Sequence, residues 1–235
     1  MKPELSVIIS ALNEEKSVKK VLEGVLNFFR LMKINGEIIF LNNHSIDNTG
    51  KIADFISEKN SELKVIHRFN RDSKDLGSSL REGLKNVTGN YILIMDCDMS
   101  HDPKEIKLLF DKRKEADIII GSRYFGGSAE MSLSRTLISK SSNFIVNNLL
   151  GVKVKDISTG FKLYKKEVFD NINLENEGFG LHVEILLKAA NRNKSLKEIP
   201  IHYERSLTDS KLNYKKQIPS YAKAVFSGMK DKFIN

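Results

Sequence analysis

The stretch Tyr91–Pro103, YILIMDCDMSHDP, decides the fold that the sequence predicts. Its apolar part, residues 91–95, is typical of a strand buried on both faces of a parallel sheet. Asp96 and Asp98 follow directly, and Asp102-Pro103 has the N-cap and first-position residues of a helix. Ligands of open α/β sheets bind beyond the carboxyl ends of strands. The two carboxylates therefore indicate a divalent cation that carries a phosphorylated substrate, with plain turn chemistry as the alternative reading.

The same alternation of apolar strands and amphipathic helices extends outward from this stretch. We expect strands at residues 5–11, 37–41, 63–67, 91–95, 117–121, 161–164 and 196–203. Helices are expected between the early strands, the first of them capped by Asn13–Glu15, and at residues 133–150, 181–191 and 215–233. This β-α-β order predicts an α/β protein with a Rossmann-like, doubly wound, mainly parallel sheet that carries helices on both faces.

Composition limits the function classes. The 235-residue chain has 40% hydrophobic residues, a net charge of +8 and one cysteine, and its pI is near 9.3. The positive charge points to an anionic partner: a nucleotide, an anionic membrane surface or nucleic acid. Nucleic acid is not expected, because no zinc-finger spacing or aromatic-basic alternation is present. The single cysteine and the absence of a signal-peptide pattern favour the cytoplasm.

Polar segments follow four of the predicted strands. They are Ser10–Glu14, Asn42–Thr49, Asp96–Asp98 and Gly121–Tyr124. In this order they resemble the family-2 glycosyltransferases of GT-A fold, and most of all the dolichol-phosphate mannose synthases and their polyprenyl-phosphate glycosyltransferase relatives. The resemblance extends from Val7 to Leu212. Each motif is weak alone, and their order and spacing make the match strong.

The resemblance implies a nucleotide site at the ends of the first two strands. It assigns Ala11, Asn13 and Glu14 to the base and ribose. Asn42-Asn43 stands where the family usually has Asp-Asp, the second of which binds the base. An amide carries no charge and offers donors as well as acceptors, so the identity of the base stays open. Cys97, between the two carboxylates, is placed in the nucleotide-contacting set, with a packing role as its alternative.

The resemblance also implies a cation site and a phosphate site. Asp96 and Asp98 are expected to bind Mg²⁺ or Mn²⁺, with Ser100 where many relatives have Gln. The phosphate-binding residues are expected to be Arg123 near the diphosphate, Arg135 and Ser139 at the acceptor phosphate, and Arg205 and Lys211 in a loop that closes over the nucleotide. Asp98, Arg123 and Arg135 are the expected catalytic residues. Of the five histidines, His101 has the least secure structural reading, because it adjoins the metal segment.

The implied activity is that of an inverting, metal-dependent glycosyltransferase. It would move a hexose, foremost mannose from GDP-mannose, onto a polyprenyl or dolichyl phosphate. The alternatives are UDP-glucose as donor, a different acceptor, or a non-catalytic nucleotide-sugar-binding module. We expect residues 1–212 to form the catalytic domain and residues 213–235 a basic amphipathic helix that could contact a membrane. The expected location is therefore peripheral, on the cytoplasmic face of a membrane or bound to a membrane-anchoring subunit.

Overall fold

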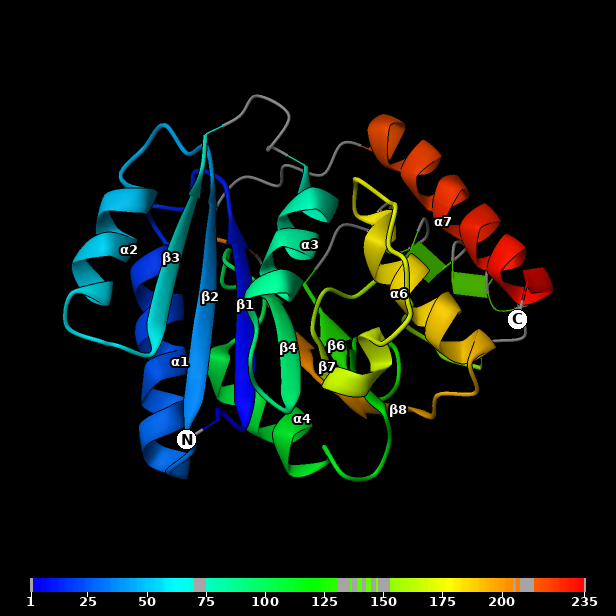
Figure 1. The fold of residues 1–235 in the computed structure, drawn as a ribbon, viewed down its shortest axis with the longest axis horizontal. Helices are drawn as coiled ribbons and strands as arrows, with labels where there is room; N and C mark the ends of the chain where they lie inside the picture. Colours follow the sequence, from blue (N-terminus) through cyan, green and yellow to red (C-terminus); the bar gives the residue numbers. More distant parts are fainter. Residues whose placement is uncertain are drawn as a thin grey trace.

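A seven-stranded sheet forms the centre of the molecule, with helices against both of its faces (Figure 1). The computed structural model describes residues 2–69, 75–130, 136, 139–140, 143–144, 147, 153–204, 206–207 and 214–234, and in the last helix the side chains of residues 218–232. The strand order is β3-β2-β1-β4-β7-β5-β8. Every pairing in this sheet is parallel except the two that β7 makes with β4 and β5, which confirms the predicted mainly parallel α/β fold.

The elements have the following bounds. The strands of the central sheet are β1 (Leu5–Ala11), β2 (Gly36–Asn43), β3 (Leu63–Arg68), β4 (Tyr91–Asp96), β5 (Ile118–Ser122), β7 (Lys162–Lys165) and β8 (Leu196–Pro200). The short strands β6 (Ser128–Ala129) and β9 (His202–Tyr203) form a separate pair. The α-helices are α1 (Val18–Met32), α2 (Thr49–Ser57), α3 (Leu76–Asn86), α4 (Ile106–Asp111), α6 (Gly180–Asn191) and α7 (Tyr214–Ile234), and the 3-10 helices are η2 (Pro103–Glu105) and η3 (Lys166–Phe169).

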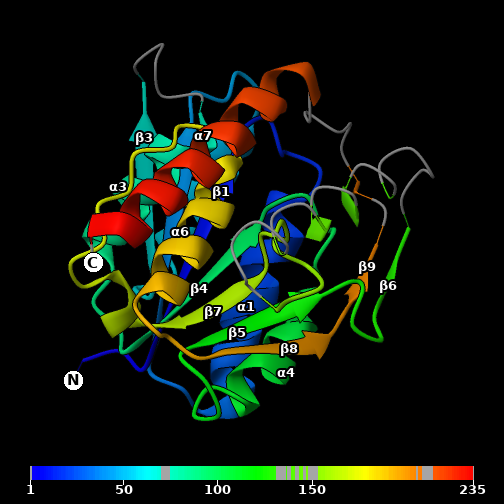
Figure 2. The same cartoon turned by 90° about the vertical axis from the view of Figure 1, so that its right-hand side faces the viewer.

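Alternate residues of the central strands fill two separate hydrophobic cores. In β1, Val7 and Ile9 belong to the core that α1, α2 and α4 cover, while Ile8 belongs to the core shared with α3 and α6. Successive side chains of a strand point to opposite faces, so a strand with apolar residues on both faces must be covered on both sides. The two layers of helices in Figures 1 and 2 provide that cover.

Two sequence-based boundaries were wrong. The predicted strand 196–203 is interrupted: β8 ends at Pro200, which has no N–H to donate, and β9 pairs instead with β6. The first helix begins at Val18 and is not capped by the segment that starts at Asn13. Asn13 lies in the left-handed region with φ of 54°, and its Oδ1 accepts a hydrogen bond of 2.9 Å from the backbone N of Ile46. The turn after β1 is therefore fastened to the turn after β2.

The C-terminal helix α7 packs along α6 on the outer side of the molecule (Figure 2). Ala224 and Gly228 of α7 are buried, and a Cβ atom added to Gly228 would lie 2.8 Å from the Leu187 Cβ atom of α6. The absence of a side chain at Gly228 thus lets the two helices approach closely. No helix in the described part of the chain combines the length and the apolar character that a bilayer crossing requires.

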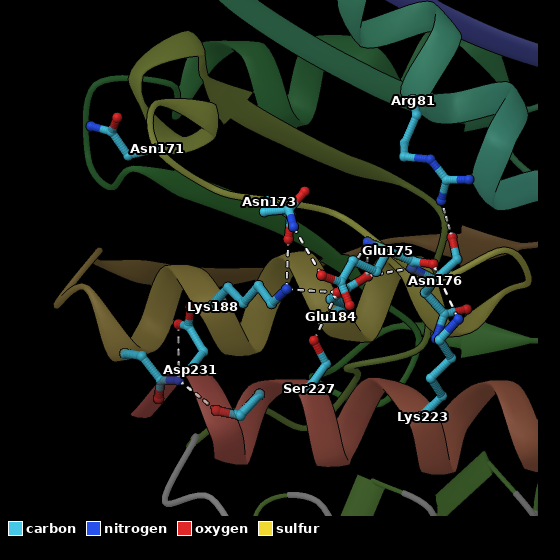
Figure 3. Close-up of polar contacts among 12 residues, drawn as sticks. Arg81, Asn171, Asn173, Glu175, Asn176, Glu184, Lys188, Lys223, Ser227 and Asp231 are labelled. Carbon is cyan, nitrogen blue, oxygen red and sulfur yellow. Dashed lines mark hydrogen bonds and ion pairs between the residues drawn. The ribbon is translucent and has the colours of Figure 1, made fainter. Parts of the chain in front are cut away.

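Glu184 of α6 is the centre of a polar network that holds α7 in place (Figure 3). The Glu184 carboxylate is fully buried and accepts hydrogen bonds from Lys188 Nζ at 2.7 Å and from Ser227 Oγ of α7 at 2.9 Å. It also accepts a bond of 2.9 Å from the backbone N of Asn176, whose carbonyl accepts from Arg81 of α3. The carboxylate of Glu184 thus links α6, α7 and the loop before α6.

Candidate active site

Asp96 and Asp98 lie at the carboxyl end of β4, as predicted for the cation site. The backbone N of Ser100 donates to Asp98 Oδ1 at 2.9 Å, which fixes the turn that carries the two carboxylates. Gly160 lies against the first of them, because a Cβ atom there would come within 3.1 Å of Asp96 Oδ2. A side chain at position 160 would therefore crowd the carboxylate.

These residues fit a divalent cation that is completed by substrate oxygens. The Asp96 side chain is 34% exposed. The Ser100 hydroxyl is fully buried and makes no hydrogen bond of ordinary geometry to the described residues, although it lies near the Tyr203 phenol. No group of three or more His, Cys, Asp or Glu among the described residues is arranged to hold a metal. Mg²⁺ often takes one or two carboxylates plus substrate phosphates, so two aspartates and a hydroxyl match that mode.

The charge around Asp96 also favours a cation. Partial burial, followed by the carboxylates of Asp98 and Glu14, raises the pKa of Asp96, while the positive charges of Arg123 and Lys162 act in the opposite direction. Like charges close together disfavour ionisation of both. A bound divalent cation would stabilise the ionised form of Asp96.

The residues predicted to hold the nucleotide come together at the ends of β1 and β2. The backbone N of Asn13 donates to Ser45 Oγ at 2.9 Å, and the backbone N of Glu14 donates to Thr49 Oγ1 at 2.7 Å. Ala11, the last residue of β1, pairs with Asn42 in the sheet. Cys97 is buried with the hydrophobic core, so a nucleotide contact there would use its backbone.

The Asn43 amide is engaged at both ends. Its Nδ2 donates to Ser10 Oγ at 2.7 Å, and its Oδ1 accepts from Arg68 Nη1 at 2.7 Å. Arg68 also donates to Ser78 Oγ of α3 at 2.6 Å, and burial lowers its pKa against the opposing charge of Asp75. Asn43 is only 3% exposed, so in this conformation it positions Arg68 and presents little amide surface to a base.

Arg123 follows β5 and is held by a buried carboxylate. Its Nε and Nη2 donate to the two oxygens of Asp156 at 2.8 and 2.7 Å, and its backbone N donates to Asp156 Oδ2 at 3.0 Å. Burial disfavours both charges, but the pairing outweighs it, raising the pKa of Arg123 and lowering that of Asp156. Arg123 Nη2 also donates to Ser158 Oγ at 3.0 Å, and that hydroxyl lies 3.3 Å from Ser139 Oγ. Two of the predicted phosphate-binding residues are thus connected.

Two buried residues near the carboxylates were not assigned by the sequence reasoning. Lys162 of β7 is fully buried, donates to the carbonyls of Ile157 and Thr159, and braces the loop that carries Asp156. A lysine inside an apolar strand was the signal that could have identified it. His101 is 1% exposed and lies with its Nδ1 4.0 Å from Asp96 Oδ2. Its position beside the metal segment had already set it apart from the other histidines.

Three of the predicted site residues lie outside the described residues. They are Arg135, Arg205 and Lys211. The predicted helix 133–150 also falls largely outside them, and its described residues 136, 139, 140, 143, 144 and 147 are helical. The roles of these three basic residues therefore stay predictions.

A sheet with this strand order and a carboxylate pair at the end of β4 can be compared with known proteins. The profile described as "Glycosyl transferase family 2" matches residues 6–172, which is more than half of the chain. The chain belongs to glycosyl transferase family 2. The matched region runs from within β1 to beyond β7 and includes Asp96, Asp98, Arg123 and Asp156.

Relatives within family 2 include mannosyltransferases. The chain is 33% identical over 234 residues to a dolichol-phosphate mannosyltransferase of Pyrococcus furiosus, an alignment that covers 97% of this chain and 64% of that protein. It is 30% identical over 218 residues to the polyprenol monophosphomannose synthase of Mycolicibacterium smegmatis, which covers 88% of this chain and 80% of that one. The chain thus spans about two thirds of the length of the Pyrococcus relative.

Solved structures confirm the GT-A-type fold. Glucosyl-3-phosphoglycerate synthase from Mycobacterium tuberculosis in complex with UDP superposes with a TM-score of 0.69 at 14% identity, over 98% of this chain and 80% of that one. Its complex with Mn²⁺ and UDP-glucose gives a TM-score of 0.67 at 16% identity, over 97% and 79%. At this level of identity, the likeness concerns the fold.

Proposed function

We propose that this family-2 protein is an inverting, metal-dependent mannosyltransferase that transfers mannose from GDP-mannose to a polyprenyl phosphate. The observation that carries the proposal is the position of Asp96 and Asp98 at the carboxyl end of β4 and of Arg123 directly after β5, where the charge of Arg123 lowers the pKa of Asp96. Mannosyltransferase relatives at 30–33% identity support the sugar and the acceptor class.

The reaction joins two anionic substrates. An oxygen of the acceptor phosphate attacks the anomeric carbon of the sugar, the bond from that carbon to the diphosphate breaks, and the nucleoside diphosphate leaves with the electron pair. The acceptor phosphate is already anionic, so no strong general base is needed. Attack opposite the leaving group inverts the anomeric centre. Asp96, Asp98 and Ser100 would hold Mg²⁺ or Mn²⁺, which stabilises the negative charge that develops on the diphosphate.

The protein's own residues would bring the two phosphates together. Arg123 is fixed by Asp156, so its guanidinium needs little reordering when an anion arrives. Ser158 and Ser139 add hydroxyl donors on the same side. We also assign acceptor-phosphate binding to Arg135 and closure over the nucleotide to Arg205 and Lys211, as the family resemblance implies.

The exposed face of α7 supports the proposal that the protein binds peripherally to an anionic membrane surface, on the cytoplasmic side of that membrane. Ile218, Phe226 and Met229 are 66%, 70% and 40% exposed, and Lys223 and Lys230 lie exposed beside them. Apolar side chains between lysines are typical of interfacial helices that bind anionic lipids. Phe226→Ser should weaken binding to vesicles containing anionic phospholipid while preserving the fold, since the inner face of α7 is untouched. Unchanged vesicle binding by the folded variant would contradict this contact.

A ligand panel tests the donor. Thermal unfolding is followed with GDP, UDP, GDP-mannose and UDP-glucose, each with and without Mn²⁺. At a ligand concentration of about 100 times the dissociation constant, linkage stabilises the folded state by about 2.7 kcal/mol. We expect this shift with the guanine nucleotides and Mn²⁺. A shift with the uridine nucleotides alone would replace GDP-mannose by UDP-glucose as donor, and no shift with any of them would contradict a catalytic role.

A further inference from the structure

His101 has an environment that packing alone does not explain. The imidazole is 1% exposed, and neither ring nitrogen has a hydrogen-bond partner among the described residues. Buried polar groups are normally paired, and those left unpaired need a specific explanation. An imidazole carries at least one N–H donor in either protonation state, and here that donor is buried.

The plane of the ring is fixed on several sides. The Phe161 ring stacks on it with centroids 4.9 Å apart and an interplanar angle of 14°. The Tyr203 ring meets it at 78° with centroids 5.2 Å apart, and the backbone of His101 forms an antiparallel bridge with that of Tyr203. The imidazole therefore has little freedom to turn toward another partner.

The Asp96 carboxylate makes a long contact with this fixed ring, on which the charges of Asp98 and Asp156 also act. Its Oδ2 lies 4.0 Å from His101 Nδ1, about 1 Å beyond an ordinary hydrogen bond. The terminal torsion of an aspartate is soft, so a small rotation can shorten this distance. Gly160 also lies close to this oxygen, since a Cβ atom at that position would come within 3.1 Å of it. The Asp96 carboxylate therefore has both Gly160 and the imidazole of His101 as close neighbours.

We propose that His101 is a positioning residue whose Nδ1–H holds the Asp96 carboxylate in the orientation that binds the cation. This inference rests on the proposed metal-dependent function. Groups behind a metal ligand commonly orient it, and their loss typically lowers metal affinity about 10–100-fold. His101 touches neither the sugar nor the diphosphate in this account, and acts through Asp96.

Two substitutions separate a positioning role of His101 from a packing role, because the two roles predict opposite answers to which variant is impaired. His101→Phe keeps an aromatic ring against Phe161 and Tyr203 but removes the donor. His101→Gln loses the stacking but keeps an N–H that can reach the carboxylate. If the residue only packs, the Phe variant should behave like the wild type and the Gln variant should be impaired. His182 provides the matched control, since it is also buried with an unpartnered Nδ1 among the described residues but has no ion pair with Asp96.

The readout is the coupling between Mn²⁺ and a nucleoside diphosphate in the full chain. Calorimetric titrations give the affinity for GDP, and in a parallel series for UDP, with and without Mn²⁺, and their ratio measures the coupling. We expect His101→Phe to reduce this ratio about tenfold or more, and His101→Gln and His182→Phe to leave it within about threefold.

Each result of these titrations supports or overturns the positioning role of His101. A wild-type ratio in a folded His101→Phe variant overturns the positioning role while the metal site stands. If that variant does not fold, a tenfold loss in folded His101→Gln overturns it instead. Affinity that is independent of Mn²⁺ in the wild type overturns the proposed metal site and this inference with it.

Discussion

Replacing Asp156 by Asn should destabilise the protein and displace Arg123. Asp156 is fully buried and the Arg123 side chain is 10% exposed, so the variant leaves a guanidinium charge buried without its counter-ion. Breaking a buried pair by removing one partner typically costs about 3–5 kcal/mol. Asn retains one oxygen that can still accept a hydrogen bond, so we expect a loss near the lower end, about 3 kcal/mol. For a chain of this size, such a loss lowers Tm by about 6–12 °C.

Urea unfolding followed by circular dichroism measures this loss. Asp54→Asn is the matched control, because Asp54 pairs with His67 at 2.9 Å but is half exposed, and its variant should lose less than about 1 kcal/mol. A second variant, Arg123→Met with Asp156→Leu, removes both charges and should be more stable than Asp156→Asn alone. A loss below about 1 kcal/mol in Asp156→Asn, or a double variant less stable than it, would refute this reasoning.

Three further variants test the balance of charges elsewhere. Lys188→Met leaves the fully buried Glu184 without its cation and should lower the free energy of unfolding, measured in urea, by about 3 kcal/mol. Lys107→Met, which breaks an exposed pair, should lower it by less than about 1 kcal/mol. Equal losses in the two variants would contradict the role of burial. Although burial acts against it, hydrogen bonds from Ser195 lower the pKa of Asp117 to about 2 from its ordinary 3.8. The carboxylate thus stabilises the fold above pH 4 by about 1–2 kcal/mol, and this contribution disappears as the pH falls from about 4 to 2. Acid unfolding of Asp117→Asn should therefore converge with the wild type below pH 2, and a constant difference would be inconsistent with this pKa.

The strands of the first half of the chain could be predicted from local patterns. Leu5–Ala11 was predicted with its correct bounds, and β4 ends one residue later than expected. These segments are continuous apolar runs with polar ends, so each can be recognised as a buried strand from its own residues alone. The position of β7 between β4 and β5 could not be predicted, because an antiparallel insertion depends on contacts distant in sequence.

The main residues of the site could be predicted from the sequence, but the hydrogen bonds and ion pairs that hold them could not. The carboxylate pair and Arg123 stand directly after strands, where polar residues are conspicuous. The partners of these groups come from remote segments: Asp156 lies 33 residues from Arg123, and Arg68 lies 25 residues from Asn43. The sequence sets His101 apart only by its place beside the metal segment, and the lack of hydrogen-bond partners for its two ring nitrogens among the described residues is seen only in the folded structure.

The most direct test of the proposed activity is the transfer reaction itself. GDP-mannose carrying a labelled sugar is incubated with the protein, a polyprenyl phosphate and Mg²⁺ or Mn²⁺, and label in the lipid fraction is measured. We predict transfer that needs both the lipid phosphate and the cation, that gives the inverted anomer, and that is abolished in folded Asp98→Ala. Transfer that persists without a divalent cation, or that Asp98→Ala leaves unchanged, would contradict the proposed mechanism.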